Sequence, residues 1–168
     1  MQTFLPWEDF TKTARALDRA RLGKQRVECK QIFNALYKGG GWRHHPVVRM
    51  WRGHGAILLR YYRHICVEWM RRGYVHTMKL DDDILERAER EIRYPPWLGA
   101  PPLHEMHRFL LCSKDPAHYR KALGMEHQHV PSIIPRFLWP VGKDGRLIRE
   151  YHAWVTPAAV EPLLLPST

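Results

Sequence analysis

Apolar side chains recur at three- and four-residue intervals between Val47 and Trp69, and this pattern constrains the fold of the chain more than any other feature. The spacing places these side chains on one face of an α-helix, whereas a strand would need an alternation with a period of two. Gly73 follows and is typical of a residue that ends a helix. The sequence therefore predicts an amphipathic helix over residues 47–72.

Four further segments have the composition or the spacing of helices. They cover residues 9–37, 81–93, 103–112 and 115–123. Gly23 lies inside the first of them and should bend or break that helix. The Pro-rich stretch 94–102 cannot form a helix, and we expect an ordered connector there.

The last part of the chain has a different character. From Arg136 onwards, two short apolar runs flank a turn sequence that contains Asp-Gly, which predicts a β-hairpin. We therefore expect a mostly α fold, with one compact helical domain of about five helices over residues 1–135. The hairpin and a loose tail, residues 136–168, should pack on the same domain.

Basic residues outnumber acidic ones. The 168 residues include 27 Lys and Arg against 17 Asp and Glu, a formal net charge of +10. This balance favours a polyanionic partner, and nucleic acid is the leading candidate. No apolar stretch approaches the roughly 20 residues of a membrane span, and the Cys residues lack metal-ligand spacing and suit a reducing compartment. We expect a cytoplasmic protein that needs no metal or cofactor, and a monomer by default.

The segment 17–28 combines four cations with two acids, Asp18 near its beginning and Glu28 at its end. Its cationic side chains are Arg19, Arg21, Lys24 and Arg26. Helical spacing gives one face to Arg21, Lys24, Gln25 and Glu28. The Glu28 carboxylate would stay ionised beside these cations and could serve a chemical step, or it could form an ordinary salt bridge with Lys24. The spacing alone leaves both interpretations open.

Residues 42–54 form a second basic segment, which follows three glycines. Arg43 and Arg49 supply permanent charge for phosphates, and His44 and His45 add hydrogen-bond donors that depend on pH. Interleaved Trp side chains could form a stacking surface or a wedge between bases. A functional interpretation is favoured for this loop.

A third segment holds His104, His107 and Arg108. Two His three residues apart could bind a metal, but the His-Glu-x-x-His order and neighbouring Cys ligands are absent from the sequence. Hydrogen bonding to phosphate or to an extruded base is the favoured interpretation. The sequence also lacks phosphate-binding loops, a Ser-His-Asp signature and aspartate clusters. The remaining chemistry is one that an amine, a carboxylate and cations can perform without a metal.

Several short motifs occur in a characteristic order along the chain. They are Leu17-Asp18, Arg21-Leu22, Glu28, His45-Pro46, Met50-Trp51, Glu68-Trp69 and Arg71-Arg72-Gly73-Tyr74. Their order and spacing resemble the pyrimidine-dimer DNA glycosylase family, of the phage endonuclease V type, from the first residues to about Tyr119. The hairpin and the tail lie outside this resemblance.

The resemblance implies a repair enzyme that acts on double-stranded damaged DNA. It implies that an N-terminal α-amine, here that of Met1, attacks the sugar C1′ of a damaged nucleotide while Glu28 assists, and that strand cleavage could follow. Val27 stands where the phage enzyme has an Arg, so Arg21 or Arg26 would supply that charge. The DNA contacts expected besides these are Arg19, Lys24, Arg43, His44, His45, Arg49, His104, His107 and Arg108.

Two other functions compete with this one. The same scaffold could remove a different modified base, or the chain could be a basic nucleic-acid-binding protein without chemistry. Both types of protein would show salt-sensitive binding, so only a test for a covalent intermediate separates an amine-using enzyme from a binding module.

Overall fold

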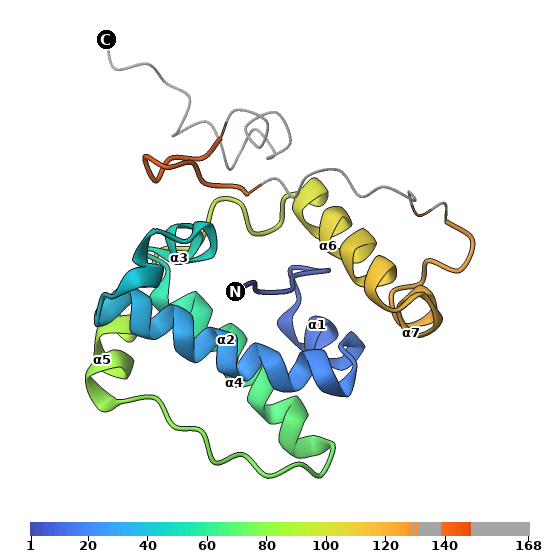
Figure 1. Cartoon of the computed structure of the whole chain (residues 1–168), viewed down its shortest axis with the longest axis horizontal. Helices are drawn as coiled ribbons and strands as arrows, with labels where there is room; N and C mark the ends of the chain where they lie inside the picture. The colour runs from blue at the N-terminus through green and yellow to red at the C-terminus, as the bar shows by residue number, and fades with distance from the viewer. Residues whose placement is uncertain (129, 131–138, 149–168) are drawn as a thin grey trace.

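The computed structural model describes residues 1–128, 130 and 139–148, and it is mostly helical, as predicted (Figure 1). No strand occurs in this part of the chain. The elements are α1 (Phe10–Ala16), α2 (Arg19–Tyr37), the 3-10 helix η1 (Gly41–His44), α3 (Pro46–Trp51), α4 (Gly55–Arg71), α5 (Asp82–Arg90), α6 (Pro101–Lys114) and α7 (Pro116–Ala122). The described residues thus contain seven α-helices, more than the five expected.

The prediction that Gly23 bends or breaks the first helix is wrong. Helix α2 runs through Gly23 without interruption, and the break lies at Leu17 and Asp18, where Asp18 caps α2 by accepting from the Arg21 N–H. A Cβ atom at position 23 would lie 2.9 Å from the ring of Trp69. The glycine therefore allows α4 to approach α2 closely.

The predicted helix over residues 47–72 is two helices. Helix α3 ends at Trp51, and α4 begins at Gly55 after Gly53, whose φ of 79° lies in the left-handed region. The apolar face continues across this break, because Trp51 and Tyr61 are both fully buried. Helix α4 packs against α1, α2 and α5 and forms the centre of the fold.

The predicted β-hairpin is not supported. Within residues 139–148 the structure has an isolated antiparallel bridge between Val141 and Leu147, closed by a hydrogen bond from the Gly142 N–H to the Arg146 carbonyl. The other residues of the predicted hairpin and tail, 136–138 and 149–168, lie outside the described residues. No helix of the described part is long and apolar enough to span a membrane.

The first nine residues precede α1 and form no regular element. Figure 1 shows this segment between α2 and α6, in the middle of the molecule. Phe4 and Leu5 are buried in the core, and Thr3 is almost fully buried beside them. The start of the chain is therefore part of the packed interior.

The close approach of α4 to α5 at Gly55 gives a stability prediction. A Cβ atom there would overlap the Tyr37 hydroxyl and lie 2.8 Å from the backbone Cα of Ala88. We expect Gly55→Ala to destabilise the fold by about 1–3 kcal/mol in urea unfolding, because the overlap includes backbone atoms that cannot rotate away.

Gly41→Ala is the matched control. Nothing lies within 4 Å of a Cβ atom at position 41, so its effect should stay within about 0.5 kcal/mol. Equal unfolding midpoints for the two variants would contradict the predicted close packing at Gly55.

Candidate active site at the N-terminus

Side chains from four helices hold residues 1–6, which we term the N-terminal segment. Gln25 of α2, Tyr61 of α4 and His104 of α6 bind its backbone, and Trp51 of α3 binds the Thr3 hydroxyl. The segment has no strand partner, so the first three side chains satisfy peptide groups that burial would otherwise leave unpaired.

Glu28 faces the first residues of the chain. Its carboxylate Oε2 accepts a hydrogen bond of 2.9 Å from the Gln2 backbone N–H, and only 7% of the residue is exposed. Its Oε1 lies 3.7 Å from the Lys24 ammonium. The salt bridge with Lys24 is present and the same carboxylate contacts the chain start, while the role of Glu28 in a chemical step stays a prediction.

Gln25 makes the most complete set of contacts with the N-terminal segment. Its side-chain NH₂ donates to the Gln2 carbonyl, and its Oε1 accepts from the Phe4 N–H, each at a distance of 3.0 Å. The Tyr61 hydroxyl lies 2.7 Å from the same Oε1 and 2.9 Å from the Phe4 carbonyl. Helical spacing placed Gln25 on the face of Glu28, yet nothing in the sequence indicated that it would hold the chain start.

His45 lies close to the N-terminal amine. Burial lowers the pKa of His45, and the positive charges of the amine and of Arg49 lower that pKa further, while Glu28 opposes them. The His45 Nδ1 accepts a hydrogen bond of 3.2 Å from the Val47 N–H at the start of α3. This bond fixes the orientation of the ring.

The predicted DNA-binding cations divide into two groups. Four of them are exposed and face solvent: Arg19, Lys24, Arg43 and His44. Arg49 is partly buried and donates to the His44 carbonyl over 2.5 Å, so it supports the loop that carries Arg43. The exposed members are accessible from solvent, while Lys24 also pairs with Glu28 and Arg19 lies over the ring of Tyr74.

Arg26 and Arg21 are engaged away from the amine. The Arg26 guanidinium stacks on the ring of Trp69 at 3.9 Å and contacts His76. Arg21 donates to Asp18 over 2.5 Å at the beginning of α2. The ion pair of Glu28 is with Lys24, and a charge supplied by Arg21 or Arg26 stays a prediction.

His104 and His107 are in the interior, and this argues against the predicted DNA contacts. His104 is 6% exposed; its Nδ1 donates to the Leu5 carbonyl over 2.8 Å and its Nε2 accepts from the Gly99 N–H. His107 is fully buried, and burial together with His104 lowers its pKa to about 3. Arg108 donates to the Pro6 carbonyl over 2.8 Å. In this conformation His104 and Arg108 hold the N-terminal segment.

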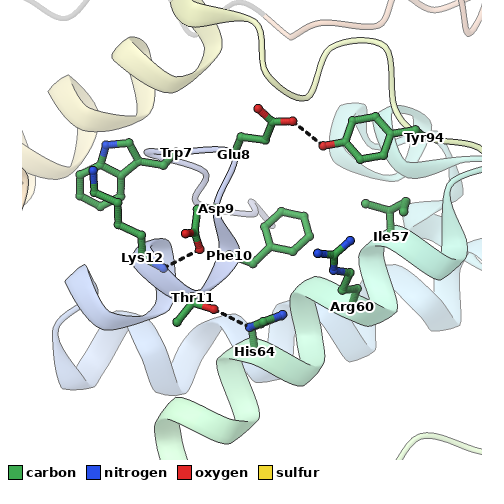
Figure 2. Close-up of a pocket in the computed structure, with 10 residues that line it drawn as sticks. All are labelled: Trp7, Glu8, Asp9, Phe10, Thr11, Lys12, Ile57, Arg60, His64 and Tyr94. Atoms are coloured by element: carbon green, nitrogen blue, oxygen red, sulfur yellow. Dashed lines mark hydrogen bonds between the residues drawn. The ribbon is translucent and has the colours of Figure 1, made fainter.

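A cavity of about 680 Å³ lies beside the residues that follow the N-terminal segment (Figure 2). Trp7 is the first residue along the chain that lines it, and Figure 2 shows Arg60 and His64 of α4 facing it. The Tyr94 hydroxyl donates to Glu8 across its rim. None of the predicted site residues lines this cavity. Among the described residues, no group of three His, Cys, Asp or Glu side chains could hold a metal ion.

A comparison with known protein families gives a match in the first half of the chain. The family model described as pyrimidine dimer DNA glycosylase matches residues 1–82. This stretch contains Glu28, the cationic segment 17–28 and the loop with Arg43 and His45. No curated protein and no solved structure shows a significant match. The resemblance stated from the sequence is confirmed over residues 1–82.

The contacts of Gln25 predict that it sets the position of the chain start. Gln25→Ala leaves the Phe4 N–H and the Gln2 carbonyl without their partner, at a cost of about 1–3 kcal/mol for each buried group. We expect a lower urea midpoint and faster hydrogen exchange of the Phe4 amide. Gln31→Ala, an exposed site on the same helix, should change neither. Unchanged exchange at Phe4 would show that Gln25 does not hold the segment.

Asp18 predicts an acid dependence of stability. Burial opposes its ionisation, but hydrogen bonds from Tyr119 and Arg21 outweigh burial and lower its pKa from 3.8 to about 2. Because the folded-state pKa is depressed, the stabilisation is fully present above about pH 4 and is lost as the pH falls through 2. The difference in urea midpoint between wild type and Asp18→Asn should shrink over that range.

Tyr119→Phe serves as the second arm of this pH experiment. It removes one donor to Asp18 and raises the folded-state pKa of Asp18 towards its ordinary value, so the loss of stability in acid should be smaller and should be complete at a higher pH than in the wild type. A difference between wild type and Asp18→Asn that does not change with pH would rule out the depressed pKa.

Proposed function

We propose, from the match of residues 1–82 to the family described as pyrimidine dimer DNA glycosylase, that the protein removes a damaged pyrimidine from double-stranded DNA with its N-terminal amine and Glu28. The observation that carries the proposal is the 2.9 Å hydrogen bond between the Gln2 N–H and the Glu28 carboxylate. It brings the second residue of the chain to the acid that the family resemblance singles out.

The reaction needs only groups that this region supplies. The neutral amine of Met1 forms a bond to the sugar C1′, the bond from C1′ to the base breaks, and the base leaves with the bonding electrons and takes up a proton. The nitrogen loses a proton, and the bond from C1′ to O4′ breaks as O4′ takes up a proton, so that the nitrogen then carries the positive charge of an iminium ion. The Glu28 carboxylate stabilises this charge and moves protons as the sugar ring opens. Loss of the 3′ phosphate by β-elimination would complete an associated AP-lyase activity.

In this proposal the exposed cations bind the DNA backbone. Arg19, Lys24 and Arg43 bind phosphates, and the contacts offset the few kcal/mol that opening a damaged base pair costs. Arg21, expected from the sequence to be catalytic, is proposed to act indirectly by fixing the start of α2 through Asp18. A monomeric state and a cytoplasmic location stay predictions.

Borohydride trapping tests the chemistry. Incubation with an ultraviolet-irradiated duplex and borohydride should leave a covalent adduct, because borohydride reduces the iminium to a stable amine. Glu28→Gln should bind the duplex nearly as the wild type does and form the adduct at least about 100-fold more slowly. Glu126→Gln, an exposed acid far along the chain, is the control and should trap normally.

Mass analysis of the adduct identifies the nucleophile. Proteolysis should leave the sugar remnant on the peptide that begins with Met1. A remnant on a Lys side chain would exclude the terminal amine, and the complete absence of an adduct would leave a DNA-binding protein without this chemistry.

A further inference from the structure

Three aromatic side chains lie next to one another, Trp42 and His45 from the loop before α3 and Trp139 from the C-terminal part of the chain. The ring centroids of Trp42 and His45 are 5.7 Å apart, and those of His45 and Trp139 are 5.8 Å apart, with the latter pair edge to face. We term these three residues the aromatic row. His45, its middle member, lies within electrostatic reach of the N-terminal amine.

The middle of the row is rigid and its outer end is open. His45 is held by the hydrogen bond from the Val47 N–H, so its ring cannot turn freely. Trp42 is 62% exposed, and it follows Gly39 and Gly40, whose φ angles of 81° and 97° lie in the left-handed region. Single exposed apolar residues are common on protein surfaces. Trp42 differs from them because exposed cations, Arg43 and His44, follow it directly and its ring contacts His45.

The far end of the row belongs to residues 139–148, which we term the C-terminal loop. Figure 1 shows this loop beside α3, in agreement with the contact between Trp139 and His45. Val141 is buried, and Leu147 and Ile148 pack against the core, so the loop is attached to the body of the protein. It lies outside the stretch that matches the family.

The turn of the C-terminal loop carries exposed positive charge. Lys143 and Arg146 are both exposed, and the one acid between them, Asp144, accepts a hydrogen bond from the Arg146 backbone N–H. Arg43 and His44 are exposed next to Trp42 at the other end of the row. Both chain segments that supply the aromatic row thus also carry exposed cations.

An aromatic surface with flanking cations matches the chemistry of an unstacked nucleotide. A base offers a π-face to an indole, and the neighbouring phosphates pair with Lys and Arg. A paired base in intact duplex is covered by its neighbours, so only a base freed by a lesion or by bending could reach Trp42.

We propose that Trp42 stacks on a base exposed at the lesion and that the C-terminal loop is a second DNA-binding element. The loop supports the aromatic row through Trp139 and binds flanking phosphates through Lys143 and Arg146. This proposal rests on the proposed function insofar as the ligand is damaged DNA. It gives the chain beyond residue 82 a direct part in lesion recognition.

The stacking part is tested with a duplex that contains a tetrahydrofuran abasic site, which the enzyme cannot process. Trp42→Ala should raise the Kd for this duplex by roughly 5- to 150-fold, because one base–aromatic stack is lost. The Kd for intact duplex should change less than about twofold, and Trp42→Phe should lie between wild type and Trp42→Ala. Equal weakening on both duplexes, or none, overturns the stacking role.

The phosphate part is tested by the dependence of affinity on salt. The double variant Lys143→Ala/Arg146→Ala should reduce the slope of log Kd against log salt by about two, one for each lost phosphate contact. Lys114→Ala/Lys121→Ala, exposed cations on α6 and α7, removes the same charge elsewhere and should leave the slope unchanged. Equal slopes in wild type and the loop variant, or equal losses in both variants, overturn the role of the loop.

These measurements are separate from the test of the chemistry. They use binding to a substrate analogue, so a failure of borohydride trapping leaves them intact. A wild-type protein that traps an adduct but whose loop variant binds normally would keep the proposed function and remove this inference.

Discussion

The N-terminal segment is the part of the structure on which the proposed chemistry depends, and it is held by side chains alone. Buried peptide groups need hydrogen-bond partners, and here they come from Gln25, Tyr61 and His104 in place of a neighbouring strand. Three helices that meet around one short segment thus determine where the chain begins in space. The packing of α2, α4 and α6 is therefore also the positioning of the amine.

The fixed position of the N-terminal segment is unusual for a chain end. Terminal residues fray unless something ties them down, and a frayed amine would meet its target only rarely. Ordering the segment during folding removes that entropic cost from the reaction itself. Glu28 completes the arrangement, because the same carboxylate contacts the segment at Gln2 and stands ready to balance a positive charge formed there.

Local patterns in the sequence predicted some of these features and missed others. Helical spacing was enough to place Gln25 and Glu28 on one face, and amphipathic periodicity was enough to predict a mostly helical fold. The break at Gly53 was missed because the apolar face continues across it. His104 was assigned to DNA because its partner, Leu5, lies 99 positions away, and no local pattern reveals a pairing over that distance.

The hydrogen bonds from α6 to the N-terminal segment have an evolutionary consequence. His104 and Arg108 lie beyond residue 82, outside the stretch by which the family is recognised, yet they bind the carbonyls of Leu5 and Pro6. Under the proposed function, selection for the position of the first residue acts also on α6, a helix for which no reacting group is proposed. Sequence changes in the two halves of this chain are expected to be correlated, since a substitution in α6 would change the position of the first residues.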